Sequence, residues 1–134
     1  MHTNNTNKNK GLIYPELSYA ITGLCFNVHN QLGRYAREKQ YSDIMEQELS
    51  GSKIPYKREC VIKNTGNIVD FLIDDKIILE IKAKNVVFKD DYYQLQRYLQ
   101  ISDKKLGLLI NFRNRYLKPI RIVKINTAAK FKFV

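Results

Sequence analysis

The first third of the chain alternates apolar and polar positions with the period of a helix. From residue 17 to residue 32 the apolar residues recur every three or four positions, at Leu17, Ile21, Leu24, Cys25, Val28 and Leu32. Such spacing gives a helix one buried face. Residues 36–51 carry a second pattern of this kind, with apolar side chains at Tyr41, Ile44, Met45 and Leu49. Gly33 interrupts the first pattern and Gly51 ends the second, so we predict two consecutive helices.

After residue 55 the period changes to that of strands. "YKRECVIK" (56–63) alternates, "NTGN" is a turn signal, and "IVDFLI" (68–73) follows. A second turn, at "DD", leads into "KIILEIKAK" (76–84). Short strands that are rich in β-formers and joined by tight turns predict an antiparallel meander of three strands.

The last third predicts one helix and two more strands. Residues 90–102 return to helical spacing, 106–112 form the continuous apolar run of a buried strand, and 119–125 alternate again. The predicted order is therefore helix, helix, three strands, helix, strand, strand. This order is typical of an α/β fold in which helices flank a mixed sheet. The helix at 90–102 fits the crossover of a right-handed βαβ unit.

Length, cysteine content and the polar start of the chain set further expectations. With 134 residues, 44% of them hydrophobic, the chain can bury the core of one domain, which we place at residues 16–134. The start "MHTNNTNKNK" predicts a disordered polar tail over residues 1–15. No apolar run approaches the roughly 18 residues of a membrane span. Cys25 and Cys60 fit no ligand spacing, so we expect free buried thiols in a cytoplasmic protein.

The charge balance favours a polyanionic partner. Lys and Arg together number 23 and Asp and Glu 13, which gives a formal net charge of +10. A charge of this size favours binding to nucleic acid. The alternative is a basic surface that serves solubility or reflects a coding bias towards Lys and Asn.

Three polar residues interrupt the apolar strands at positions that suit a metal site. Asp70 lies inside "IVDFLI", and Glu80 and Lys82 share one face of the next strand because side chains alternate. Adjacent antiparallel strands would bring the two carboxylates together. Oxygen ligands of this kind suit Mg²⁺ or Mn²⁺, and the backbone carbonyl of Ile81 would add another. Lys82 would then position the attacking water or stabilise charge on a phosphate. The alternatives are an Asp70 carboxylate satisfied by backbone amides and a partly buried Glu80–Lys82 ion pair.

A fourth and a fifth polar residue, Gln94 and Tyr98, lie one helical turn apart on the next predicted helix. The ordered set D-x9-E-x-K followed by Q-x3-Y resembles the PD-(D/E)XK nuclease superfamily, and its Q-x-x-x-Y element is similar to that of the RecB-type branch. Over residues 17–125 the chain is more similar still to the GxxExxY family of small PD-(D/E)XK proteins. The stretches that carry this resemblance are "VHNQLG", "REKQYSDIMEQEL", "IPYKRE", "VDFLIDDKIILEIKA", "QLQRYL" and "LGLLINF".

The resemblance implies a restriction-endonuclease-like core and a metal-dependent nuclease that uses Mg²⁺ or Mn²⁺, with DNA ahead of RNA as substrate. The site residues that it implies are the acidic metal ligands Glu38, Asp70 and Glu80, the catalytic lysine Lys82, and the supporting residues Gln94 and Tyr98. One position departs from the family pattern, because its glycine would fall at Tyr35 and the chain has Gly33 instead. The alternative function is a catalytically inactive nucleic-acid-binding or assembly module with the same fold.

Basic residues around these positions are candidates for contacts with phosphates. They are Lys57, Arg58, Lys84, Lys89, Arg97, Arg113 and Arg115, of which Lys84 continues the face of Glu80 and Lys82. The alternative for the others is that they are plain solvated charges. His29 has two interpretations, as a metal ligand or as a packed, hydrogen-bonded histidine. The sequence leaves the oligomeric state open, with a homodimer as one option.

Overall fold

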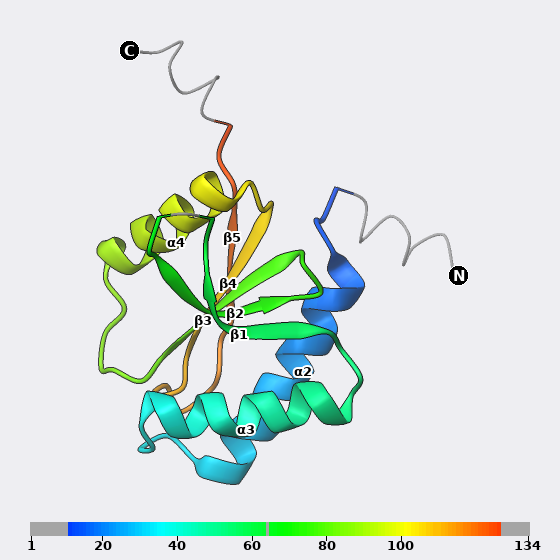
Figure 1. Cartoon of the computed structure of the whole chain (residues 1–134). Helices are drawn as coiled ribbons and strands as arrows, with labels where there is room; N and C mark the ends of the chain where they lie inside the picture. Colours follow the sequence, from blue (N-terminus) through cyan, green and yellow to red (C-terminus); the bar gives the residue numbers. More distant parts are fainter. Residues whose placement is uncertain (1–10, 64, 127–134) are drawn as a thin grey trace.

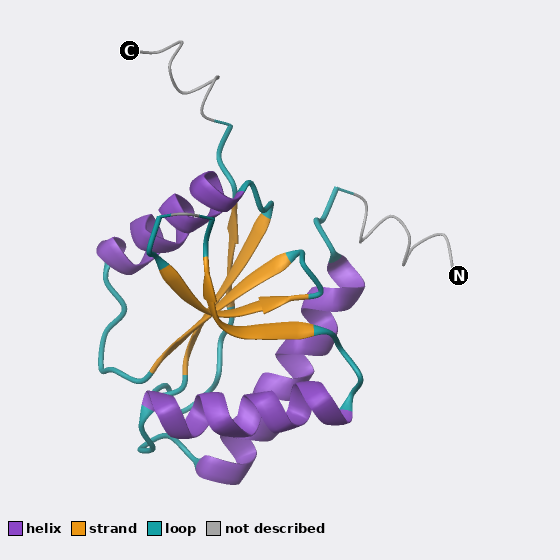
Figure 2. Cartoon of the chain, in the orientation of Figure 1, coloured by secondary structure: helices purple, strands orange, loops and turns teal. Residues whose placement is uncertain are grey.

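The structure, a computed structural model, describes residues 11–63 and 65–126. In chain order its elements are α2 (Pro15–Leu32), α3 (Glu38–Gly51), β1 (Tyr56–Val61), β2 (Ile68–Ile73), β3 (Ile77–Lys82), α4 (Lys89–Ser102), β4 (Leu106–Asn111) and β5 (Ile120–Val123). Figure 1 shows their arrangement and Figure 2 their type. The predicted α/β class and the predicted order of two helices, three strands, a helix and two strands are confirmed.

The strands form one mixed sheet in the order β1-β2-β3-β4-β5. The pairs β1–β2 and β2–β3 are antiparallel, as the predicted meander requires, and β4–β5 is antiparallel as well. Strands β3 and β4 are parallel and α4 connects them. The carboxyl ends of β3 and β4 therefore lie at the same edge of the sheet.

Helices cover both faces of the sheet, with α2 and α3 on one face and α4 on the other (Figure 1). Ile21 and Met45 pack with Phe71 in the larger core, while Leu95 and Leu99 form the smaller core on the α4 side. All six residues of β4 are buried, as expected of a central strand covered on both faces. At Gly107 an added Cβ would lie 2.8 Å from the Leu95 side chain, so glycine lets α4 approach the sheet.

The ends of several elements differ from the prediction. Helix α2 begins at Pro15, and of the predicted tail the structure describes residues 11–15, where Ile13 and Tyr14 pack against the larger core. Residues 1–10 lie outside the described residues. Strand β1 ends at Val61, two residues earlier than predicted. Pro15 suits the start of α2, because the N–H that proline lacks would make no hydrogen bond within the helix at this position.

The two cysteines and the helices bear on the remaining expectations. Cys25 and Cys60 are both free thiols; Cys25 is buried, whereas Cys60 is half-buried. Burial raises the pKa of the Cys25 thiol to about 12, so it is protonated and unreactive at neutral pH. Within the described part of the chain, none of the helices has the length and apolar character needed to cross a membrane.

Candidate active site

The meander is irregular where β1, β2 and β3 pass Asp70. The β1–β2 register runs from Tyr56↔Ile73 to Val61↔Ile68 but omits Glu59 and Asp70. The β2–β3 register stops at Phe71↔Leu79, before Asp70 would pair. Asp70 is thus the residue of β2 that neither neighbouring strand pairs.

In both β1 and β2, the side chains change from one face of the sheet to the other at this point. Tyr56 and Phe71 pack towards α2 and α3, whereas Cys60 and Val69 pack towards α4. Tyr56 and Cys60 are four residues apart in β1, and Val69 and Phe71 are two residues apart in β2. In a regular strand, residues an even number apart lie on the same face. Glu59 has a φ of 50°, a left-handed conformation that costs energy for a residue with a side chain. The change of face at Glu59 and Asp70 opens the sheet on one side of β3.

Two side-chain hydrogen bonds take the place of the missing ladder. The backbone N–H of Asp70 donates to Glu80 Oε1 at 3.1 Å, and the backbone N–H of Ile81 donates to Asp70 Oδ2 at 2.7 Å. These bonds hold the two predicted carboxylates side by side on adjacent strands. A residue in an antiparallel strand directs its N–H and C=O to the same neighbour, so the Ile81 carbonyl also faces this opening.

Burial makes the acidic pair electrostatically unfavourable. Glu80 is only 6% exposed. Burial and the neighbouring Asp70 carboxylate raise the pKa of Glu80 to about 8. Burial also raises the pKa of Asp70, against the opposing effects of the Ile81 N–H and of Lys82. Two carboxyl groups in contact, of which Glu80 is buried and Asp70 half-buried, favour a shared proton or a bound cation.

Lys82 extends from the end of β3 beside this pair, but its ion-pair partner is on α4. Lys82 Nζ lies 3.9 Å from Asp91 Oδ1, and Lys84 Nζ lies 2.6 Å from Asp91 Oδ2. Asp91 Oδ2 also accepts the N–H of Phe88 at 2.8 Å, which caps the start of α4. One carboxylate therefore anchors both lysines, in place of the Glu80–Lys82 ion pair considered as an alternative.

On the other side of the acidic pair, a hollow of about 240 Å³ lies between α3 and the sheet. Its lining residues are Glu38, Lys39, Ser42, Arg58, Glu59 and Asp70. Glu38 is exposed and is the first residue of α3, so the structure places it in the same hollow as Asp70. No three His, Cys, Asp or Glu side chains form a metal-ligand group within residues 11–63 and 65–126. The oxygens gathered in one place are those of Asp70 and Glu80.

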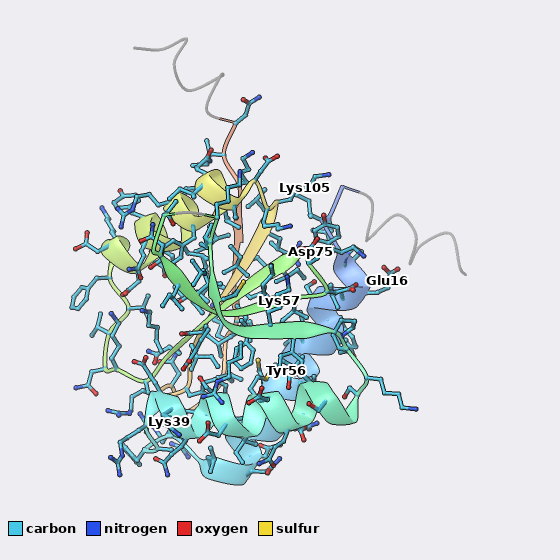
Figure 3. The ribbon with its side chains drawn as sticks, in the orientation of Figure 1. Glu16, Lys39, Tyr56, Lys57, Asp75 and Lys105 are labelled. Carbon is cyan, nitrogen blue, oxygen red and sulfur yellow. The ribbon has the colours of Figure 1, made fainter. Side chains whose placement is uncertain are left out.

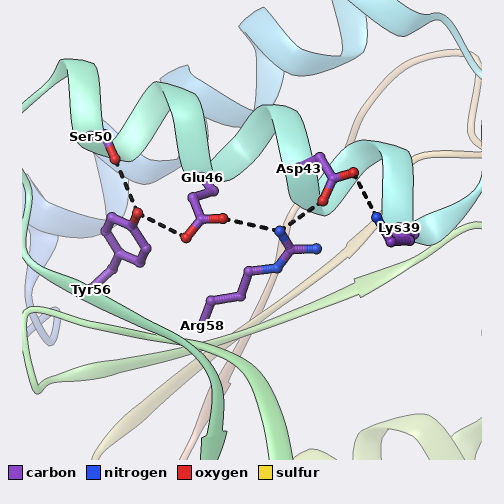
Figure 4. Close-up of polar contacts among 6 residues, drawn as sticks. All are labelled: Lys39, Asp43, Glu46, Ser50, Tyr56 and Arg58. Carbon is purple, nitrogen blue, oxygen red and sulfur yellow. Dashed lines mark hydrogen bonds and ion pairs between the residues drawn. The ribbon is translucent and has the colours of Figure 1, made fainter.

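A polar network fixes α3 to β1 next to this hollow (Figure 4). Arg58 Nη1 lies 2.8 Å from Asp43 Oδ1 and 3.1 Å from Glu46 Oε1. The Tyr56 hydroxyl donates to Glu46 Oε2 at 2.9 Å and also contacts Ser50 Oγ at 3.0 Å. Arg58 was expected to contact phosphate, but two carboxylates balance its charge. Its position favours a role in holding α3, and with it Glu38, beside Asp70.

Helix α4 brings the other predicted residues to the opposite face of the sheet. Tyr98 is buried, and burial together with the nearby Glu80 carboxylate raises its pKa. Gln94 and Arg97 line a hollow of about 350 Å³ with Asp91. The salt bridges of Asp91 connect this hollow to Lys82 and Lys84.

Two predicted residues lie apart from the acidic pair. Lys57 is on the exposed side of β1 near the turn at Asp75, away from Lys39 at the start of α3 (Figure 3). His29 Nε2 lies 2.9 Å from the carbonyl oxygen of Asn114, and its ring centroid is 6.1 Å from that of Phe112. These contacts match the packed, hydrogen-bonded interpretation of His29.

The sequence interpretation missed Asp91, Glu59 and Asn111. Asp91 and Glu59 carry no signal, because acids at a helix start or on an exposed strand are common. Asn111 does carry one, since it interrupts the apolar run "LGLLINF" as Asp70 interrupts "IVDFLI". It is buried; its Oδ1 accepts the Lys84 N–H at 3.1 Å and its Nδ2 donates to the Lys84 carbonyl at 2.7 Å.

Comparisons with known proteins bear on the whole of this arrangement. A family model described as the PD-(D/E)XK nuclease superfamily matches residues 15–123, from the start of α2 to the end of β5. The observed order of elements and the mixed sheet are consistent with a restriction-endonuclease-like core. No curated protein and no solved structure matches the chain.

Proposed function

We propose that this chain, which belongs to the PD-(D/E)XK nuclease superfamily, is a metal-dependent nuclease that hydrolyses phosphodiester bonds in nucleic acid, with DNA ahead of RNA. The observation that carries the proposal is the Asp70–Glu80 pair. A buried carboxyl group, Glu80, and a half-buried one, Asp70, interrupt a sheet ladder, bond to each other's strand and have raised pKa values. Such an arrangement disfavours two ionised carboxylates unless the pair shares a proton or binds a cation, and a divalent cation is what the superfamily typically uses.

The residues present fit a divalent metal ion of the kind that the superfamily typically uses. Asp70 and Glu80 would hold Mg²⁺ or Mn²⁺ with the carbonyl of Ile81, and waters and substrate phosphate would complete the coordination. Glu38 lines the same hollow as Asp70 and would bind through a water. When bound, the ion supplies Lewis-acid stabilisation of the phosphate and activates water.

The remaining residues act on the substrate side. The Lys82 ammonium would donate a hydrogen bond to the scissile phosphate and stabilise the charge that develops there. Asp91 holds this ammonium at the end of β3 and so limits the conformations that Lys82 must lose in the transition state. Tyr98 lies near enough to Glu80 for that carboxylate to raise its pKa, and Gln94 would contact the substrate from the α4 side.

Membership of the GxxExxY subfamily is part of the proposal. Its support is the E-x-x-Y spacing of Glu38 and Tyr41. The Tyr41 hydroxyl donates to the Gly33 carbonyl at 2.6 Å and accepts the Ala36 N–H at 3.2 Å. Tyr41 thereby ties the loop before α3 to its own helix, even though Tyr35 stands at the position of the family glycine.

The test is cleavage of labelled single-stranded, double-stranded and branched DNA, and of RNA, in Mg²⁺, Mn²⁺ or EDTA. Glu80→Gln is the informative variant, because a glutamine oxygen can still accept the Asp70 N–H while its charge is lost. We expect metal-dependent cleavage that falls at least about 100-fold in Glu80→Gln. Cleavage that persists in EDTA, or at the normal rate in Glu80→Gln, would refute the assignment.

A second candidate is a module that binds nucleic acid or assembles with a partner without cutting. The net charge of +10 and the lack of a three-residue metal-ligand group among the described residues favour it. A binding module gives salt-sensitive binding and no metal-dependent product. An assembly subunit gives a defined oligomer in light scattering and neither binding nor cleavage.

A further inference from the structure

Three loops meet beyond the carboxyl ends of β3 and β4, and Arg113 connects them. The loops are residues 33–37, 83–88 and 112–116, which together we call the loop surface. Arg113 Nε donates to the Arg34 carbonyl at 2.9 Å, and Arg34 Nε donates to the Arg113 carbonyl at 2.9 Å. Arg113 Nη2 also donates to the Ala83 carbonyl at 3.4 Å. The side chain of Arg113 thus connects its own loop to the other two.

Each loop is also attached to a regular element. Asn111, at the end of β4, makes two hydrogen bonds with the backbone of Lys84. The Tyr41 hydroxyl, on α3, holds the Gly33 carbonyl. A surface fixed in this way is ordered before a ligand arrives and loses little conformational freedom on binding.

Exposed aromatic rings stand on all three loops, each next to a cation. Tyr35 is 75% exposed, Tyr116 78% and Phe88 61%. The guanidinium carbons of Arg34 and Arg113 lie 5.1 and 5.6 Å from the Tyr35 ring centroid. Arg115 lies 5.4 Å from the Tyr116 ring, and Lys84 Nζ lies 5.6 Å from the Phe88 ring.

This combination matches the chemistry of unpaired nucleotides. Exposed aromatic rings stack on bases whatever their sequence, and neighbouring cations bind the phosphates that link them. A duplex hides the faces of its bases in its own stack, so it gains only the phosphate contacts. Single exposed aromatics are common on protein surfaces, but these three lie on loops that hydrogen bonds hold together.

The loop surface borders the candidate active site on two sides. Residues 33–37 lead directly into Glu38, which shares its hollow with Asp70. Residues 83–88 follow Lys82 and lead into α4, whose Asp91 pairs with Lys82 and Lys84. These lysines offset the negative charge of Asp91 next to the surface. A strand bound across the loops would continue towards the acidic pair.

We propose that the loop surface binds unpaired nucleotides by stacking on Tyr35 and Tyr116, and that the substrate is a single strand or the unpaired part of a branched nucleic acid. The statement about substrate rests on the proposed nuclease function, whereas the binding does not require cleavage.

The experiment compares binding of fluorescent oligo(dT) and of a duplex of equal length to the full chain, in EDTA and at several salt concentrations. Tyr35→Ala removes the ring, Tyr35→Phe keeps it, and Tyr19→Ala is the matched control. Tyr19 is 82% exposed on α2, outside the loop surface. We expect tighter binding of the single strand than of the duplex, and a loss of at least about five-fold in Tyr35→Ala. Tyr35→Phe and Tyr19→Ala should bind normally.

Salt separates stacking from charge. Tyr35→Ala should leave the slope of log K against log salt unchanged, whereas Arg115→Ala should reduce its magnitude by about 0.7, the value for one phosphate contact on a single strand. Equal binding by Tyr35→Ala and Tyr19→Ala, or tighter binding of the duplex, would overturn the inference. Tyr35-dependent binding without cleavage in Mn²⁺ supports it and counts against the nuclease. Cleavage that depends on Glu80, together with binding that does not depend on Tyr35, supports the nuclease and overturns the inference about the loop surface.

Discussion

The two edges of β3 are built on different principles. Towards β4, all six residues from Ile77 to Lys82 pair in an uninterrupted parallel register. Towards β2, pairing stops at Leu79, and the carboxylates of Asp70 and Glu80 take over the hydrogen bonds of the backbone. The β4 edge is held by backbone bonds and buried apolar side chains. The β2 edge sets two acids, buried Glu80 and half-buried Asp70, against each other, which costs stability and suits the cation site that we propose.

This comparison predicts that mutations at the two edges have opposite effects on the stability of the metal-free protein. Truncation at the β4 edge removes packing and should destabilise. Removal of a charge at the β2 edge relieves repulsion and should stabilise wherever that charge is ionised.

The largest effect is expected at the β4 edge, for Leu106→Ala. Leu106 is fully buried and pairs with Ile77 and Val123, at the far end of β3 from Glu80. Loss of its side chain leaves a cavity, so the free energy of unfolding should fall by about 2–5 kcal/mol. Denaturant unfolding at pH 7 measures it. A change below about 1 kcal/mol would show that this edge is not close-packed.

A smaller effect with a particular pH dependence is expected at the β2 edge. The pKa of Glu80 rises from 4.5 in the unfolded chain to about 8 in the folded one. Between these values the folded state binds more protons than the unfolded state, so the free energy of unfolding falls as pH rises through this window. Below about pH 4.5 both states are protonated and the contribution is complete; above about pH 8 it is lost.

Glu80→Gln tests this dependence, because glutamine does not titrate. Between pH 5 and pH 9 in EDTA, the wild type should lose on the order of 3–4 kcal/mol relative to Glu80→Gln. Denaturant unfolding at matched pH values gives the difference, in which the titrating groups that do not interact with Glu80 cancel. Parallel stability curves for the two proteins would contradict the raised pKa.

The same contrast explains what could be predicted from the sequence. The pairing of β3 with β4 follows from the continuous apolar run at 106–112 and from the helix before it. A strand that is buried on both faces and reached through a helix is typical of a parallel pair. The closeness of Asp70 and Glu80 follows from alternation and a short turn. These rules act between neighbours in the chain and need no knowledge of the rest of the fold.

The irregular features of the fold could not be predicted from the sequence. Glu59 takes a left-handed conformation without the glycine that would signal it. The change of face between Phe71 and Val69 breaks the alternation on which the prediction relied. The contact of Asp91 with Lys82 depends on where α4 starts above the sheet, and residues that far apart are related only by the complete fold.

The smallest expected effect joins the two edges. At pH 8.5, above the pKa of about 8 of Glu80, that carboxyl group is mostly ionised, so Mg²⁺ should bind the acidic pair and stabilise the folded state. The gain should be about 1.4 kcal/mol at ten times the dissociation constant. Glu80→Gln should lose most of this gain, since it loses a ligand charge. Leu106→Ala, although less stable overall, should keep the same gain because its cavity lies away from the site.

Thermal or denaturant unfolding with and without Mg²⁺ measures all three proteins. An equal gain in Glu80→Gln would place the ion elsewhere, and a gain lost in Leu106→Ala would mean that the two edges of β3 do not act independently.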